Sequence, residues 1–205
     1  AFRDEVVEVD EVNQKGEVIR RKELMELPAV VDDETMPKES WLVDFCRAER
    51  QQGRKVLIYL RQTGTRDIQD RILKILRDGG VRAEVLSSGV NPRKREEWIA
   101  RRVIGLDALV VNPKLVATGL DLIAFSSVVF LEIEYSLYVL WQSLRRVWRL
   151  GQTKPVKAIF SVYNDTMESR ALALIGAKMK AAQLLYGDNV GGAIVPEEEG
   201  DILMK

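Results

Sequence analysis

The chain has 205 residues, of which 46% are hydrophobic and 30% are charged, a composition typical of a soluble folded domain. Its 31 basic residues equal its 31 acidic residues, so a basic surface for an anionic partner requires an uneven distribution of charge. Histidine is absent, which excludes Ser-His-Asp and Cys-His catalysis within the chain. A single cysteine, Cys46, excludes an internal disulfide and is typical of a reducing cytoplasm. No apolar run approaches the ~20 residues that a membrane-spanning helix needs, so no membrane partner is expected.

Residues 1–50 are predicted to form an N-terminal extension. It begins with two strand-like segments, 5–9 and 17–20, which could pair as a hairpin. It ends in a predicted helix over 37–51, whose apolar residues lie on one face.

From residue 51 to 186, short apolar runs alternate with segments that have helical periodicity. Apolar runs of this length suit strands that are buried on both faces of a parallel sheet. The predicted strands are 56–60, 82–86, 107–111, 128–131 and 156–163, and the predicted helices are 65–77, 91–102, 114–117, 137–150 and 166–186. This alternation implies an α/β fold in three layers, a parallel β-sheet with helices on both faces. Residues 187–205 are expected to form a flexible tail.

Ligands of such sheets bind at the carboxyl ends of the strands. The loops that carry the function are therefore expected to follow Leu60, Leu86, Val111 and Leu131. The helices are expected to cover the faces of the sheet.

The segment from Gln142 to Gln152 concentrates positive charge. On the helix predicted over 137–150, Gln142, Arg146 and Arg149 share one face. An apolar stripe lies opposite them and consists of Leu140, Leu144, Val147 and Trp148. The planar arginine fork donates two parallel hydrogen bonds and keeps its charge, so Arg146 and Arg149 could clamp a terminal phosphate. A solvated basic face on an amphipathic helix explains the same charges without a ligand.

A second candidate segment is Thr118-Gly119-Leu120-Asp121, which follows a predicted strand. Gly119 permits a tight approach of the backbone to a ligand. Asp121 could accept hydrogen bonds from a ribose hydroxyl, and Thr118 could donate one to a phosphate. An ordinary turn between two elements is the alternative interpretation.

Two further loops offer groups that suit a nucleic-acid backbone. Arg61 and Thr63 follow the first strand of the alternating region and could contact phosphates. Ser88 and Gly89 follow the next strand and offer a hydroxyl and close backbone amides. Each could equally be a polar residue of an ordinary loop.

The spacing Gln142-x-x-x-Arg146-x-x-Arg149-x-Gly-Gln resembles the sixth conserved motif of superfamily-two helicases. The Gly-Gln ending and the Thr-Lys-Pro-Val that follows it resemble Swi/Snf-type DNA translocases. This resemblance implies that Arg146 and Arg149 are arginine fingers that reach ATP across the interface between two RecA-like lobes. It also implies that Gln142 helps to place them.

Other segments resemble the same family. Gly119-Leu120-Asp121 resembles the fifth motif, which links the ATP site to the nucleic-acid track. The strand 56–60 with its trailing Arg61-Gln62-Thr63 resembles the fourth motif, and Ser87-Ser88-Gly89 resembles the loop that follows it. The chain departs from the usual family residues at three places, Asn112-Pro113, Glu134-Tyr135-Ser136 and Trp148.

The sequence lacks a Gly-x-x-x-x-Gly-Lys-Ser/Thr phosphate loop, and no Asp-Glu motif follows a predicted buried strand. The resemblance therefore implies the second RecA-like lobe of an ATP-dependent DNA helicase or translocase. ATP and Mg²⁺ would be held mainly by an N-terminal lobe of the same parent, so this chain alone is expected to be inactive. The expected partner is DNA, in duplex form, and the expected location is the cytoplasm or the nucleoid.

Two alternatives remain at this stage. The chain could be a RecA-like module that binds nucleic acid or protein without catalysis. It could also be an unrelated nucleotide-binding enzyme that uses the same type of sheet, which predicts tight nucleotide binding by this chain alone.

Overall fold

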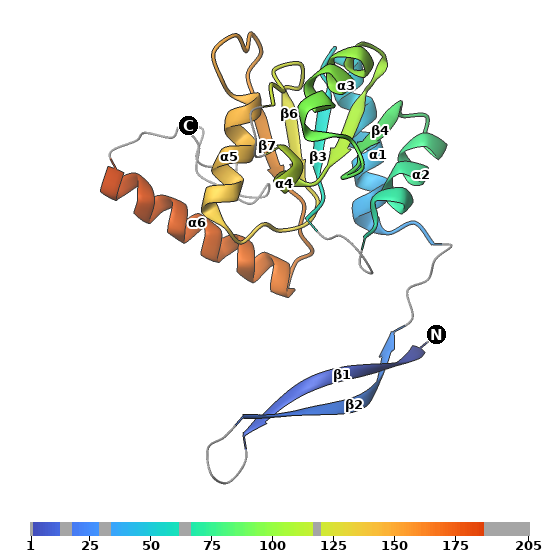
Figure 1. The fold of residues 1–205 in the computed structure, drawn as a ribbon, viewed down its shortest axis with the longest axis vertical. Helices are drawn as coiled ribbons and strands as arrows, with labels where there is room; N and C mark the ends of the chain where they lie inside the picture. Colours follow the sequence, from blue (N-terminus) through green and yellow to red (C-terminus); the bar gives the residue numbers. More distant parts are fainter. Residues whose placement is uncertain (1, 13–17, 29–33, 62–66, 117–119, 187–205) are drawn as a thin grey trace. The chain divides into compact units, whose positions relative to one another are not determined.

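A computed structural model describes residues 2–12, 18–28, 34–61, 67–116 and 120–186 (Figure 1). The chain divides into two units, Ala1–Met36 and Pro37–Lys205, which are described separately.

The first unit is an antiparallel hairpin. Strand β1 (Phe2–Val12) pairs with strand β2 (Val18–Pro28), and the register runs from Phe2 opposite Pro28 to Val12 opposite Val18. The predicted hairpin is confirmed, although its strands are longer than the apolar patches suggested. The register places acidic residues of β1 opposite basic residues of β2, at the pairs Glu8–Lys22 and Asp10–Arg20.

The second unit is built on a five-stranded sheet in the order β4-β5-β3-β6-β7. The strands are β3 (Val56–Tyr59), β4 (Ala83–Leu86), β5 (Ala108–Val111), β6 (Ser127–Phe130) and β7 (Lys157–Phe160). All neighbouring strands are parallel. Every residue of the three central strands is buried, as expected for strands that are covered on both faces. The predicted parallel α/β fold is confirmed.

Helices cover the two faces of this sheet (Figure 1). They are α1 (Pro37–Gln51), α2 (Gln69–Asp78), α3 (Arg95–Arg102), α4 (Pro113–Val116), α5 (Leu137–Val147) and α6 (Met167–Tyr186), with short 3₁₀ turns at Pro92–Lys94 and Val103–Gly105. One core joins α1 and α2 to Ile58, Val110 and Val129 of the sheet. The other core joins α3, α5 and α6 to the opposite face of the sheet.

Helix α1 belongs to the sheet unit and not to an N-terminal extension that ends at residue 50. Its apolar side chains Leu42, Val43 and Cys46 are buried in the core that it shares with α2. An amphipathic helix needs a surface on which to bury its apolar face, and the sheet supplies that surface. The boundary between the units therefore lies between Met36 and Pro37.

Two buried carboxylates link α1 to the end of the sheet at which the parallel strands begin. Glu49, which is 2% exposed, lies 2.8 Å from both Lys157 Nζ and Arg54 Nε and accepts a hydrogen bond from Ser127. Asp107, which is 3% exposed, accepts hydrogen bonds from the Arg82 side chain at 2.6 and 3.0 Å. It also lies 3.3 Å from Arg50 Nη1.

These contacts make the stability of the fold depend on pH. Burial by itself would raise the pKa of Asp107, but hydrogen bonds from Arg82 and Arg50 and the charge of Arg82 lower it from 3.8 to about 2. Because the folded pKa lies below the unfolded one, Asp107 stabilises the fold above pH ~4, and this contribution of about 2 kcal/mol is lost as the pH falls toward 2. We expect Asp107→Asn to remove this contribution, measured as the free energy of unfolding in urea at pH 7 and in steps between pH 4 and 2. The exposed Asp78→Asn is the control, and equal pH profiles for both variants would contradict the assignment.

Candidate functional site

Helix α5 ends three residues earlier than the sequence predicts. It begins after Ser136, whose hydroxyl accepts a hydrogen bond from the Val139 amide, and it ends at Val147. Residues 148–151 form a turn, which we call the arginine turn, and Gly151 adopts a φ of 98°. That left-handed conformation favours glycine. The helix itself ends because the backbone leaves the helical conformation at Trp148, where ψ is 88°. The predictions that Arg149 lies on the helix and that Trp148 belongs to its apolar stripe are therefore wrong, and Trp148 is 57% exposed.

The side chain of Gln152 holds the arginine turn in place. Its Nε2 lies within hydrogen-bonding distance of the carbonyl oxygens of Ile123, Phe125 and Val147, at 3.0, 2.9 and 3.2 Å. Its Oε1 accepts a hydrogen bond from the Lys154 amide at 3.0 Å. The last carbonyls of a helix lack partners within the helix, so Gln152 also satisfies the carboxyl end of α5.

The arginine turn lies at the end of the sheet at which the parallel strands begin. The Leu122 amide donates to the Arg146 carbonyl at 3.1 Å, and Leu122 precedes β6 in the chain. Lys154, just beyond the turn, donates to the carbonyl of Gly53, which precedes β3. Helix α5 thus runs back along the sheet to the edge at which the strands begin. Arg146 and Arg149, the predicted arginine fingers, therefore lie away from the loops that follow the strands.

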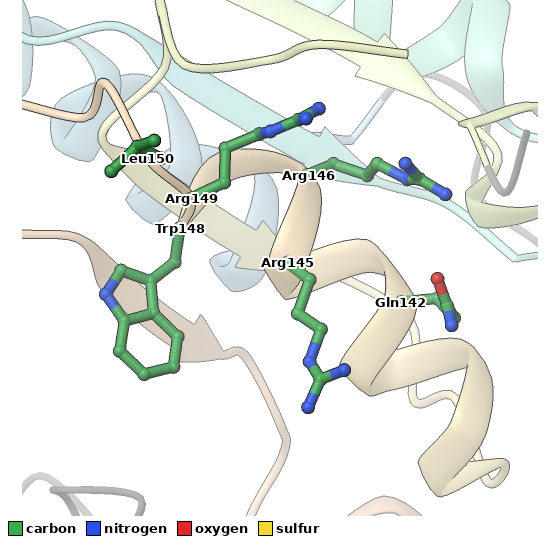
Figure 2. A pocket seen from close by; sticks show the side chains of 6 residues that line it. All are labelled: Gln142, Arg145, Arg146, Trp148, Arg149 and Leu150. Atoms are coloured by element: carbon green, nitrogen blue, oxygen red, sulfur yellow. The ribbon is translucent and has the colours of Figure 1, made fainter. Parts of the chain in front are cut away.

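An open cleft of about 550 Å³ lies beside this end of α5, lined by Gln142, Arg145, Arg146, Trp148, Arg149 and Leu150. Figure 2 shows Gln142, Arg146 and Arg149 extending to the same side, whereas Arg145 and Trp148 point elsewhere. The predicted grouping of these three side chains is therefore retained although Arg149 is outside the helix. Arg149 is exposed, and within the part of the chain that the structure describes its guanidinium has no hydrogen-bond acceptor or ion-pair partner.

Asp121 lies close to the same end of α5. Its neighbours Leu120 and Leu122 are buried, and Asp121 itself is half-buried, with Oδ1 accepting a hydrogen bond from the Ile123 amide at 3.2 Å. The bond between Leu122 and Arg146 fixes this segment against the arginine-bearing end of the helix. Thr118 and Gly119, the other predicted residues of this segment, lie outside the described residues.

Arg61 lies at the opposite end of the sheet, where the parallel strands end. Its amide donates to Glu132 at 2.5 Å, and its Nε lies 3.8 Å from Glu134. Its guanidinium lies 5.5 Å from the centre of the Tyr135 ring. Asn112 donates to the Arg61 carbonyl at 2.8 Å, so this departure from the usual family residues ties the loop after β3 to the start of α4. These partners could not be predicted from the sequence because they are 51 to 74 positions away in the chain and meet Arg61 only where parallel strands end.

The remaining residues of the predicted nucleic-acid track are described only in part. Ser88 and Gly89 are exposed at the carboxyl end of β4, an outer strand of the sheet. Thr63 lies outside the described residues. The structure therefore separates two groups of candidate residues, with Arg146, Arg149, Gln142 and Asp121 toward one end of the strands and Arg61, Ser88 and Gly89 at the other.

Tyr59 connects strand β3 to the arginine-bearing helix, a role that the sequence did not reveal. The side chain is 1% exposed, and its hydroxyl donates to the Ser143 carbonyl of α5 at 3.2 Å. Its ring stacks on Phe130, and Phe130 stacks on Phe160, with centroid distances of 5.1 and 4.8 Å. Burial raises the pKa of Tyr59 well above its ordinary value, so the hydroxyl remains a proton donor.

The described residues contain neither a candidate membrane span nor a candidate metal site. No helix there combines the length and the apolar character that crossing a membrane requires. No group of three or more Cys, Asp or Glu side chains there lies close enough together to hold a metal ion.

The fold and the sequence are similar to those of known proteins. The chain resembles the solved C-terminal part of the Fun30 ATPase domain with a TM-score of 0.58 and 18% identity, over 71% of this chain and 47% of that one. At this identity the likeness shows the fold alone, a RecA-like α/β lobe. Residues 37–151 match the family described as the helicase conserved C-terminal domain, which is more than half of the chain. The chain belongs to this family.

The relatives are ATP-dependent helicases and helicase-like proteins of Swi/Snf type, which confirms the resemblance inferred from the motifs. The ATP-dependent helicase rhp16 of Schizosaccharomyces pombe is 27% identical over 113 residues, 54% of this chain and 13% of its own length. The helicase-like transcription factor CHR27 of Arabidopsis thaliana is 27% identical over 141 residues, 68% of this chain and 13% of its own length. CHR28 of the same plant is 31% identical over 85 residues, 42% of this chain and 9% of its own length. The chain thus spans about a tenth of the length of the relatives that it matches.

Proposed function

We propose that this chain is the second motor lobe of an ATP-dependent DNA helicase or translocase and that it supplies Arg146 and Arg149 as arginine fingers. The observation that carries the proposal is the exposed Arg149 guanidinium, which extends to the same side of an open cleft as Arg146 and Gln142. Membership of the helicase C-terminal family and the names of the relatives support it.

The side chains of this cleft suit the phosphates of a nucleotide that is held mainly by a first RecA-like lobe. Two guanidinium groups present fixed positive charge and several donors to the terminal phosphate, and they stabilise the charge that spreads over its oxygens during transfer. Gln142 supports their placement from the same side of α5. Asp121 is proposed to accept hydrogen bonds from the ribose of the nucleotide, and Gly119, which lies outside the described residues, is proposed to let the chain come close to it. Mg²⁺, which neutralises phosphate charge when it is bound, is assigned to the first lobe.

The loops at the carboxyl ends of the strands would contribute to the surface that binds the nucleic acid. Arg61, Ser88 and Gly89 are the proposed contacts there, with the phosphate backbone of duplex DNA as the ligand. Thr63 and Thr118, which lie outside the described residues, are proposed as further contacts of the same kind. Arg61 already lies close to Glu134, so binding a phosphate there would exchange a weak ion pair at 3.8 Å for a new one. This part of the track would therefore respond to ionic strength, as other phosphate contacts do.

Nucleotide binding by the 205-residue chain alone tests the proposal. We expect calorimetric titration with ATP and Mg²⁺ to give weak or no binding, because this lobe provides only one side of the site. The full-length parent should hydrolyse ATP, with stimulation by duplex DNA. Tight binding by the chain alone would instead indicate an independent nucleotide-binding enzyme. A parent with no DNA-stimulated hydrolysis would indicate a binding module without motor activity.

A further inference from the structure

A cleft that is rich in arginine lies beside the start of strand β4. It is open to solvent and has a volume of about 450 Å³, and we call it the β4 groove. Its charged side chains are three arginines and one glutamate, namely Arg77, Arg82, Arg102 and Glu84. Glycine backbone forms part of its wall at Gly80 and Gly105, where a Cβ would meet open space. Because cations outnumber carboxylates on this wall, the groove suits an anionic ligand.

Contacts within the sheet unit orient two of these arginines. Arg82 donates through Nε and Nη2 to the two carboxylate oxygens of Asp107, at 3.0 and 2.6 Å. Arg102 Nε lies 2.8 Å from Glu84 Oε2, and the Arg102 guanidinium lies 4.3 Å from the centre of the Trp98 ring. Neither guanidinium has another partner within the described residues, so each has N–H donors left for a ligand. Side chains that are oriented before binding lose less conformational entropy on association.

The outer edge of β4 offers backbone groups beside the same groove. Strand β4 is the end strand of the sheet, and the Arg82 carbonyl accepts a hydrogen bond from the Ala108 amide of β5 at 3.2 Å. Because successive residues of a strand direct their backbone groups to opposite sides, Ala83 and Val85 face away from β5. The Arg77 side chain agrees with this direction, since its Nε donates to the Ala83 carbonyl at 3.2 Å. The amide and carbonyl of Val85 therefore have no partner strand in the sheet that the structure describes.

We propose that the β4 groove binds an extended acidic segment of a partner protein. The backbone of this segment pairs with the outer edge of β4, as peptides do when they add a strand to a sheet. Its carboxylate side chains bind Arg77, Arg82 and Arg102, because the planar arginine fork matches a carboxylate in bidentate geometry. The site goes beyond the proposed motor function, since it uses none of the residues that are assigned to ATP or DNA.

The position of the β4 groove favours an acidic protein segment over the DNA of the proposed function. The groove lies where β4 and β5 begin, at residues 80–84 and 105–106. Arg61, Ser88 and Gly89 lie where the strands end, so phosphates bound there are at the other end of the sheet. A single extended chain can also pair with the edge of a strand, which a DNA duplex cannot do.

Binding of fluorescein-labelled hexaglutamate to the 205-residue chain, followed by fluorescence anisotropy at low ionic strength, tests this site. We expect saturable binding that Arg77→Gln and Arg102→Gln each weaken by about tenfold, through the loss of one charge-assisted contact. Arg101→Gln is the matched control, because Arg101 precedes Arg102 on α3 but pairs with Glu97 and does not line the groove. The melting temperatures of the three variants should stay near that of the wild type, because all three side chains are exposed.

Three results would overturn the acidic-peptide site. The wild-type chain does not bind hexaglutamate, Arg101→Gln weakens binding as much as Arg102→Gln, or duplex DNA displaces the bound peptide and so assigns the groove to nucleic acid. A hexaglutamate that carries N-methyl groups at alternate residues tests the pairing with β4, because it lacks amides that donate to a strand edge. We expect it to bind more weakly than hexaglutamate, and equal binding of the two peptides would overturn the pairing.

Discussion

Replacing either Arg146 or Arg149 with alanine in the full-length parent is expected to lower the kcat of DNA-stimulated ATP hydrolysis by on the order of 10³-fold or more. The loss should fall on kcat, because the arginines act most strongly on charge that develops during phosphate transfer. Binding of the nucleotide should change little, since the first lobe is proposed to hold most of it. Steady-state ATPase assays over a range of ATP concentrations, with saturating duplex DNA, separate the two effects.

Arg145→Ala is the matched control for these variants. Arg145 sits on the same helix and lines the same cleft, but Figure 2 shows its side chain pointing away from Gln142, Arg146 and Arg149. We expect it to hydrolyse ATP at close to the wild-type rate. Arg→Lys at 146 or 149 should recover only part of the rate, because lysine keeps the charge but not the planar fork. Near wild-type turnover in both alanine variants would show that these residues are not arginine fingers.

Glu49→Ala is expected to destabilise the sheet unit by about 3 to 5 kcal/mol, the usual cost of removing one partner from a buried ion pair. The Glu49 carboxylate faces Arg54 and Lys157, and the Arg54 side chain is only 11% exposed. Without the carboxylate, this cation remains poorly solvated and the link from α1 to β6 and β7 is broken. Urea unfolding of the 205-residue chain at pH 7, followed by circular dichroism, measures the loss.

Glu97→Ala tests whether burial of the ion pair causes the loss of stability that is expected for Glu49→Ala. Glu97 pairs with Arg101 on the surface of α3, where the two side chains are 58% and 74% exposed. Pairs of this kind contribute about 0 to 1 kcal/mol, so the variant should unfold close to the wild type. Equal losses in the two variants would show that the Glu49 cluster adds nothing beyond an ordinary surface pair.

The sheet was predictable because its central strands are continuous apolar runs. The segments around Ile58, Val110 and Val129 are buried on both faces, and a strand in that environment has no reason to alternate polar and apolar residues. The helices between them kept their amphipathic period, so the order of elements followed directly. The membership of α1 in this unit was missed because its apolar face is buried against α2 and the sheet, which follow it in the chain, and no local pattern reports that contact.

The candidate site was predictable in its residue types but not in its geometry. The spacing of Gln142, Arg146 and Arg149 indicated a common side, which the structure retains. The end of α5 depends on Gln152, whose carbonyl partners at Ile123 and Phe125 are 29 and 27 positions away. No local propensity reports a contact at that distance. For the same reason the sequence did not show that Arg146 and Arg149 lie at one end of the parallel strands and Arg61 at the other.

Because the two groups of residues lie at opposite ends of the strands, a rotation of the sheet about one end displaces the other end. Strands of four residues span about 13 Å, and the buried core around them is too densely packed to deform gradually. A rigid-body rotation of roughly 15° about the end that carries Arg146 and Arg149 would therefore move the other end by about 3.4 Å, close to the axial spacing of one nucleotide in a DNA strand. Under the proposed function, a small tilt at the arginines thus corresponds, at Arg61, to a displacement of one nucleotide along the DNA.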